Sequence, residues 1–305
     1  NLNMGKIYNG MNTDVNEIDN PKDLDDAIGL LNSIGGWVCN RDDVKFRDDE
    51  IKRIYNILRK YIYKNVLLVG DYGSGKRSVV GGYCGYLWKK GEHEMVFSLD
   101  FTEILKIATN PSEFDKIVSD IFYAACDDTL NMTLNINNIG ELLNSNLYGN
   151  AGHSFINKMI KYMDDGGVKI IATATHRELK EIEEHFPTLL NYFTVIKMKE
   201  FTVEESSNII LDLKDEFEKQ FKLKLPDGFE RIICENADRY IKDKAMPGKA
   251  ENLLDEVCSY ISNKNNSSDE IKNLFDEIND KKLELFDIIK SNNFDAANIL
   301  SDEII

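Results

Sequence analysis

A glycine-rich loop holds the residues whose types and spacing could do chemistry. It consists of Gly70, Asp71, Tyr72, Gly73, Ser74, Gly75, Lys76, Arg77 and Ser78. The spacing of Gly70, Gly75 and Lys76 matches GxxxxGK[ST], in which backbone N–H groups curl around phosphates and the lysine reaches β and γ oxygens. An apolar run (VLLV, residues 66–69) precedes the loop, and a helical pattern follows it. Because a phosphate-binding loop requires this context, the loop predicts a nucleotide site.

The last position of the motif departs from the pattern. Arg77 stands where a Ser or Thr hydroxyl would ligate Mg²⁺. A guanidinium repels a divalent cation and attracts phosphate oxygens. We therefore predict that ATP or ADP is the cofactor, that Mg²⁺ is weakly bound or absent, and that Arg77 pairs with the β-phosphate, or with Asp71 when the loop is empty. For Lys76 the alternative to phosphate contact is a remnant held by the loop geometry.

The strand that should supply acidic groups to a hydrolytic site ends in amides. Residues 132–136 (MTLNI) predict a buried strand, and Asn137 and Asn138 follow it. An ATPase needs one carboxylate for Mg²⁺ and one to orient the attacking water. A neutral amide is a poor ligand for a divalent cation and cannot accept the proton of water. An acidic pair elsewhere in the chain is the alternative, so the sequence leaves open whether this is an enzyme.

Alternating strand and helix patterns must hold the loop. Five apolar runs predict strands, over residues 66–69, 95–99, 132–136, 168–173 and 193–198. Helical spacing predicts the helices between and around them, over residues 47–60, 78–89, 111–125, 152–163 and 177–184. This alternation is typical of an α/β unit with a parallel sheet flanked by helices.

After residue 199 the apolar spacing is helical throughout. Helices are expected over residues 202–221, 226–236 and 249–262, and a polar linker and a further apolar stripe predict a C-terminal helical hairpin. The predicted organisation is a lead-in segment at 1–40, a large α/β subdomain at 41–199, a small helical subdomain at 200–262 and the hairpin at 263–305.

Composition excludes several classes of protein. Asp plus Glu outnumber Lys plus Arg by 53 to 37, for a net charge of −16. Such a surface is repelled by nucleic acid and by anionic membranes, so we expect neither as a partner. The five cysteines lack CxxC spacing and the four histidines lack a ligand pattern, so we expect no metal-ligand site and the buried thiols of a cytosolic-type protein.

Further motifs lie outside the loop. They are RDDEI at residues 47–51, IIATAT at 170–175, and DRYI at 238–241 followed by MPGKA at 246–250. With the loop, they resemble the first ATPase domain of the Clp unfoldases of the AAA+ superfamily, of the ClpB and ClpC type, which has GR-x-x-E-I, a sensor strand, and DRYI followed by LPDKA. The tail at 287–303 resembles the UVR-like hairpin in the middle domain of ClpC. The resemblance covers about residues 41–305 and implies an AAA+ fold.

Carried over to this sequence, the family pattern implies sensor side chains at Thr173 and Thr175, although threonine is also an ordinary strand residue. The arginines that reach a neighbouring subunit's site are replaced by Asn191 and Tyr192, and the aromatic residue of the central pore by Asn110. With no catalytic residue assigned, we expect a degenerate pseudo-ATPase associated with a chaperone or protease. It would contact other Clp or AAA+ subunits or an adaptor protein, and be a monomer in isolation.

Two alternatives to the pseudo-ATPase differ in the partner they require. One is an active ATP-dependent Clp unfoldase domain with unconventional acidic ligands. The other is a clamp-loader-like subunit acting on DNA, which the net charge of −16 disfavours.

Overall fold

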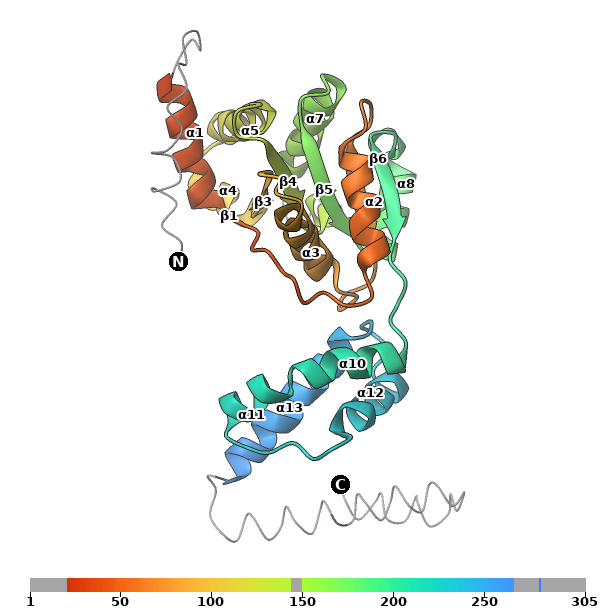
Figure 1. The fold of residues 1–305 in the computed structure, drawn as a ribbon. Helices are drawn as coiled ribbons and strands as arrows, with labels where there is room; N and C mark the ends of the chain where they lie inside the picture. The colour runs from red at the N-terminus through yellow and green to blue at the C-terminus, as the bar shows by residue number, and fades with distance from the viewer. Residues whose placement is uncertain (1–20, 144–149, 266–279, 281–305) are drawn as a thin grey trace. The chain divides into compact units, whose positions relative to one another are not determined.

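The chain folds into two compact units that meet in sequence between Lys199 and Glu200. A computed structural model describes residues 21–143, 150–265 and 280 (Figure 1). Most of the hairpin predicted over 263–305, including the tail at 287–303, lies outside these residues. The first unit holds the phosphate loop, and the second consists of helices over its described residues.

The first unit contains one sheet. Its strands are β1 (Gly35–Trp37), β2 (Asn65–Val69), β3 (Met95–Leu99), β4 (Met132–Ile136), β5 (Lys169–Ala174) and β6 (Phe193–Lys197). They lie in the order β1-β3-β4-β5-β2-β6, with β2 to β6 parallel and β1 antiparallel at one edge. The predicted parallel α/β sheet is therefore confirmed, and β2, which carries the loop, lies between β5 and β6.

Helices cover both faces of this sheet. Those of the first unit are α1 (Pro21–Ile34), α2 (Asp48–Leu58), α3 (Lys76–Lys89), α4 (Phe101–Ile107), α5 (Pro111–Cys126), α7 (Asn150–Asp164), α8 (His176–His185), α9 (Pro187–Leu190) and the 3-10 helix η3 (Ile139–Leu143). One core joins α2 and α3 to Val66 and Leu68 of β2, and the other joins α1, α5 and α7 to Leu67 and Val69 (Figure 1). A strand buried on both faces explains the unbroken apolar run before the loop.

The lead-in segment predicted at 1–40 belongs, from Pro21 on, to the first unit. Leu31 and Ile34 of α1 are fully buried in the core, and β1 extends the sheet by pairing with β3. Gly35, the first residue of β1, allows a close approach of the two strands. A Cβ atom at Gly35 would lie 2.3 Å from the carbonyl oxygen of Ser98.

The second unit packs four helices over its described residues, around Ile210, Phe229 and Leu254. They are α10 (Val203–Asp212), α11 (Lys214–Phe221), α12 (Phe229–Tyr240) and α13 (Gly248–Asn265). The single helix predicted over 202–221 is two helices separated at Leu213. α10 buries Ile210 in the core, whereas α11 packs Phe217 and Phe221 against it only in part.

A buried lysine links the two motifs of the second unit. The Nζ atom of Lys249 lies 3.0 Å from Oδ1 of Asp238 and 3.5 Å from Oε1 of Glu200, and its side chain is 5% exposed. The DRYI and MPGKA motifs are therefore joined by an ion pair between α12 and α13.

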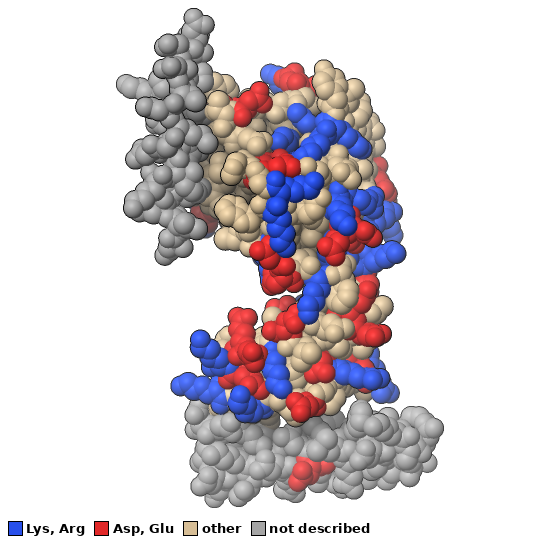
Figure 2. Space-filling view, viewed as in Figure 1, with Lys and Arg blue, Asp and Glu red and all other residues tan. Residues whose placement is uncertain are grey.

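Charged side chains of both signs lie on the face of each unit that is visible in Figure 2. Figure 2 shows Lys and Arg interspersed with Asp and Glu over the visible face. Over the stretches that the structure describes, no helix combines the length and the apolar character needed to cross a lipid bilayer.

Candidate nucleotide-binding site

The loop of residues 70–75 connects β2 to α3 at the carboxyl edge of the sheet. Its first residue, Gly70, donates its N–H to the carbonyl of Ala174 on β5 at 3.0 Å. Gly73 and Gly75 have φ values of 87° and 85°, a left-handed conformation that glycine adopts without a steric penalty. The residue that caps α3 is Gly75, so no side-chain hydrogen bond from the cap position satisfies the first N–H groups of the helix. The loop thus has the backbone form that receives an anion at a helix N-terminus.

Lys76 is folded back into the loop. Its side chain is buried, with the residue 9% exposed, and Nζ donates hydrogen bonds to the carbonyl oxygens of Gly70 and, at 3.2 Å, Asp71. Burial lowers the pKa of this ammonium group, against the attraction of Glu178 and Asp71. Carbonyl groups hold Lys76 at the place in the motif from which a lysine reaches phosphate oxygens.

A buried arginine, Arg47, holds the backbone of the phosphate loop. Its Nη2 donates to the carbonyl of Ser74 at 3.0 Å and to that of Lys199 at 2.9 Å. Its Nη1 contacts Oε1 of Glu50 on α2 at 2.9 Å. The sequence offered Arg47 only as part of a resembling motif, and its contact with the loop backbone is visible in the structure alone.

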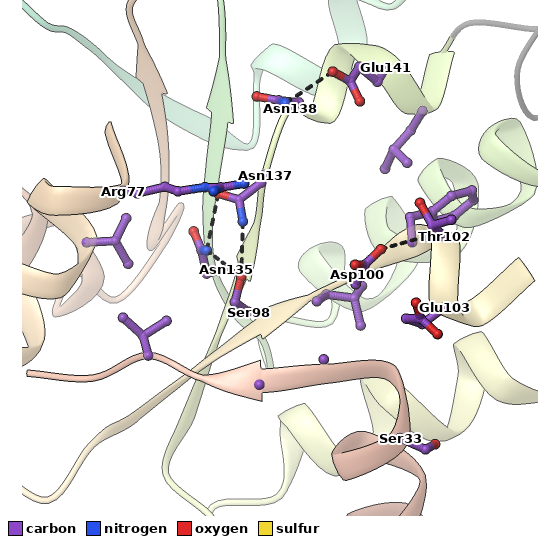
Figure 3. Close-up of a pocket in the computed structure, with 17 residues that line it drawn as sticks. Ser33, Arg77, Ser98, Asp100, Thr102, Glu103, Asn135, Asn137, Asn138 and Glu141 are labelled. Atoms are coloured by element: carbon purple, nitrogen blue, oxygen red, sulfur yellow. Dashed lines mark hydrogen bonds between the residues drawn. The ribbon is translucent and has the colours of Figure 1, made fainter. Parts of the chain in front are cut away.

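The two amides that follow β4 are engaged in hydrogen bonds. Asn137 donates from Nδ2 to Oγ of Ser98 on β3 at 3.0 Å, and Asn135 donates to the same oxygen at 3.0 Å (Figure 3). Asn138 donates from Nδ2 to Oε1 of Glu141 at 3.1 Å and from its backbone N–H to Oγ1 of Thr173 at 2.9 Å. The carboxyl ends of β3, β4 and β5 are joined by neutral groups and one carboxylate.

Arg77 and these amides line one cavity of about 560 Å³. In Figure 3 the Arg77 side chain extends from α3 toward Asn137. Asp100 and Glu103 at the start of α4, and Glu141 on η3, line the same space. Over the described residues no ion pair joins Arg77 to Asp71, the partner predicted for the empty loop. The guanidinium is exposed and directed to the strand ends instead.

The two predicted sensor threonines occupy different positions. Thr173, on β5, is 1% exposed and accepts the hydrogen bond from Asn138. Thr175 caps α8: its hydroxyl accepts from the N–H of Glu178 at 3.1 Å, and the Glu178 carboxylate accepts from the N–H of Thr175 at 2.6 Å. Thr173 lies at the strand ends with the site, whereas the Thr175 hydroxyl is committed to a helix cap.

Tyr72 of the loop contacts Glu141, a residue that the sequence pattern did not single out. The hydroxyl of Tyr72 donates to Oε1 of Glu141 at 3.2 Å. Burial, together with the negative charges of Glu178 and Glu141, raises the pKa of Tyr72. Glu141 lies three residues after Asn138, but nothing in the sequence pattern indicated that it would face the loop.

Other residues singled out in the sequence have structural partners. Ser78 accepts a hydrogen bond from Nη1 of Arg41 at 3.3 Å. Asn110 caps α5 by accepting from the N–H of Glu113 at 2.9 Å. Tyr192 donates to Asp164 at 3.0 Å. Over the described ranges no cluster of three or more His, Cys, Asp and Glu residues has the arrangement of a metal site.

Comparison with known sequences finds relatives of both units. Residues 202–304 match the family described as AAA lid domain. The chain is 28% identical to the chaperone protein ClpB of Malacoplasma penetrans over 228 residues, which cover 73% of this chain and 32% of that protein. It is 28% identical to ClpB of Bacillus cereus over 226 residues, which cover 72% of this chain and 26% of that protein. The chain therefore spans a third or less of the length of these curated relatives.

Solved structures share the fold. The S. cerevisiae Hsp104:casein complex matches with a TM-score of 0.68 and 20% identity, over 78% of this chain and 42% of that chain. The S. cerevisiae Hsp104-ADP complex matches with a TM-score of 0.69 and 18% identity, over 90% of this chain and 41% of that chain.

Proposed function

Because the chain is an AAA+ domain of the Clp type, we propose that it is a pseudo-ATPase of a Clp chaperone or protease system. It binds ADP or ATP with little dependence on Mg²⁺, hydrolyses ATP poorly or not at all, and acts through contacts with other proteins. The bound nucleotide stabilises the first unit, because a ligand that binds only the folded state raises its stability.

The observation that carries this proposal is the combination of Arg77, Asn137 and Asn138 around one cavity. The phosphate cradle fits a nucleotide, since Gly73 and Gly75 keep their left-handed conformations and Lys76 remains in the loop. The cation position does not fit Mg²⁺. A guanidinium replaces the hydroxyl ligand, and the amides that replace the acidic pair are engaged with Ser98 and Glu141. A neutral amide cannot take a proton from water, so the same residues remove the hydrolytic base.

Calorimetry with ATP and ADP tests the binding, first with Mg²⁺ and then with EDTA, followed by a phosphate-release assay on the same sample. We expect binding that EDTA leaves unchanged and no release of phosphate. Lys76→Ala should abolish binding, and Arg77→Thr should weaken binding in EDTA about tenfold, the size of one charge-assisted contact. The matched control Arg53→Thr removes an exposed arginine of α2 and should change neither. Absence of nucleotide binding contradicts the proposal.

A second candidate function, an active ATPase, draws support from Glu141. This carboxylate lies 3.1 Å from the amide of Asn138 and faces the same cavity, so it could supply the acidic group that β4 lacks. Phosphate release that requires Mg²⁺ and is lost in both Lys76→Ala and Glu141→Gln would establish this function and displace the pseudo-ATPase.

The proposed partners are other Clp or AAA+ subunits or an adaptor protein, in the cytoplasm or in an organellar stroma or matrix. We propose residues 263–305 as the segment on which these partners dock. The chain alone is then a monomer, since Asn191 and Tyr192 replace the arginines that the resemblance places at a ring interface. Light scattering with and without ADP tests this: an oligomer assembled by nucleotide would contradict it.

A further inference from the structure

A carboxylate lies beside the phosphate loop and has no role in the proposed binding. Oε1 of Glu141 accepts the hydroxyl of Tyr72, a loop residue, at 3.2 Å and the amide of Asn138 at 3.1 Å. Nζ of Lys76 lies over the Tyr72 ring, 5.5 Å from its centroid. Tyr72 therefore contacts both the lysine of the loop and the carboxylate of η3.

Glu141 lies at the carboxyl ends of β4 and β5, toward which a phosphate chain bound in the loop would extend. It lines the cavity with Arg77, Asn137 and Asn138 (Figure 3). Its partner Asn138 is bonded to Thr173 at the end of β5. A phosphate chain that starts in the loop at Lys76 and runs toward the ends of β4 and β5 approaches this carboxylate with its outermost group.

The two charges near the position of the outer phosphate, Arg77 and Glu141, act on it with unequal strength. Arg77 is the cation among the residues that line the described cavity, and it is exposed to solvent, which screens its attraction for phosphate. Glu141 is only partly exposed, and two hydrogen bonds fix its carboxylate in place. Repulsion between partly buried charges is screened less than attraction by a charge exposed to solvent. The outer phosphate thus gains less from Arg77 than it loses to Glu141.

We infer that this site is selective for nucleoside diphosphates over nucleoside triphosphates, with Glu141 as the residue that sets the preference. The inference rests on the proposed nucleotide binding. The loop holds the α and β phosphates of either nucleotide, and Lys76, which binds the β phosphate of both, must share its single charge with the γ phosphate of ATP. A γ phosphate brings its additional negative charge next to the Glu141 carboxylate. The neutral amides of Asn137 and Asn138 replace the acidic groups that would bind a cation and so screen this repulsion.

Calorimetry on the full chain in EDTA tests this preference with ADP and ATP. We expect ADP to bind at least tenfold more tightly than ATP, a ratio that one charge repulsion at short range readily produces. Glu141→Gln keeps the size of the side chain and one acceptor oxygen for its partners. It should tighten ATP binding about tenfold and leave ADP binding within twofold. Pyrophosphate and tripolyphosphate should repeat the preference, since neither carries a base.

The matched control is Glu103→Gln, which removes another carboxylate of the same cavity. Glu103 is paired with Lys106 at the exposed start of α4, so neither affinity should change. ATP that binds the wild-type chain as tightly as ADP overturns the inference but leaves nucleotide binding intact. The inference also fails if Glu141→Gln changes both affinities equally, because Glu141 then acts on the loop through Tyr72. If neither nucleotide binds, the proposed function fails together with the inference.

Discussion

Replacement of Arg47 by methionine should destabilise the first unit and loosen the phosphate loop. Arg47 is 3% exposed and donates to the carbonyl groups of Ser74 and Lys199 at 3.0 and 2.9 Å. A hydrogen bond from a charged donor contributes about 1.5–3 kcal/mol. Ser74 is buried, so the free energy of its hydrogen bond with Arg47 is lost in full. Lys199 is exposed, so water can replace part of the hydrogen bond to its carbonyl group. The free energy of unfolding should fall by about 3 kcal/mol.

Tryptophan fluorescence during denaturation measures this loss for the first unit, because both tryptophans of the chain, Trp37 and Trp88, belong to it. For a unit of this size, about 3 kcal/mol corresponds to a fall in Tm of roughly 6–12 °C. Arg53→Met is the matched control, since Arg53 is an exposed arginine on the same helix. If the two variants unfold within about 0.5 kcal/mol of each other, a typical surface effect, Arg47 does not fix the loop.

Three further predictions concern stability. Phe46 has a φ of 58°, so Phe46→Gly should raise the unfolding free energy by about 1 kcal/mol in thermal denaturation, while an equal gain in Phe46→Ala would exclude backbone strain as the cause. The hydrogen bond from Lys249 lowers the pKa of Asp238. The ionised Asp238 therefore stabilises the folded state above the unfolded pKa of about 4, and this stabilisation is lost as the pH falls through the folded pKa. In Asp238→Asn, acid unfolding followed by circular dichroism should depend less on pH. The Glu94 side chain is 4% exposed and 3.2 Å from Nζ of Lys169, so Glu94→Gln should cost about 3 kcal/mol by tryptophan fluorescence, and a cost under about 1 kcal/mol would contradict that pairing.

Much of the fold of the first unit follows from local patterns. The strands from β2 to β6 carry apolar runs that are too short for typical helices, and several of the helices between them carry the 3.6-residue period. β1 could not be predicted, because its partner determines it. Gly35 and Gly36 indicate a turn by themselves, and only the contact with Ser98 and Phe97 of β3 makes them a strand.

The site was predictable to the extent that its chemistry is contiguous in sequence. The loop from Gly70 to Ser78 carries its own geometry, so its conformation and its place after β2 could be expected. Arg47 is 27 residues from its partner Ser74 in the loop, and Glu141 is 69 residues from its partner Tyr72. No local period or spacing encodes such contacts, and without an alignment their side chains could have pointed to solvent.

The charges around the cavity give a physical reason for the Mg²⁺ independence that we propose. Relative to the usual phosphate loop and acidic pair, Arg77 adds one positive charge, and Asn137 and Asn138 each remove one negative charge. Glu141 returns one negative charge beside them. The net change is two positive charges, which is the charge that a Mg²⁺ ion brings to an ordinary site. Fixed side chains can therefore neutralise two phosphates without a metal, but they cannot reposition when a third phosphate extends toward Glu141. Metal independence and preference for the diphosphate are then two consequences of the same substitutions, and Glu141→Gln should alter the second while leaving the first unchanged.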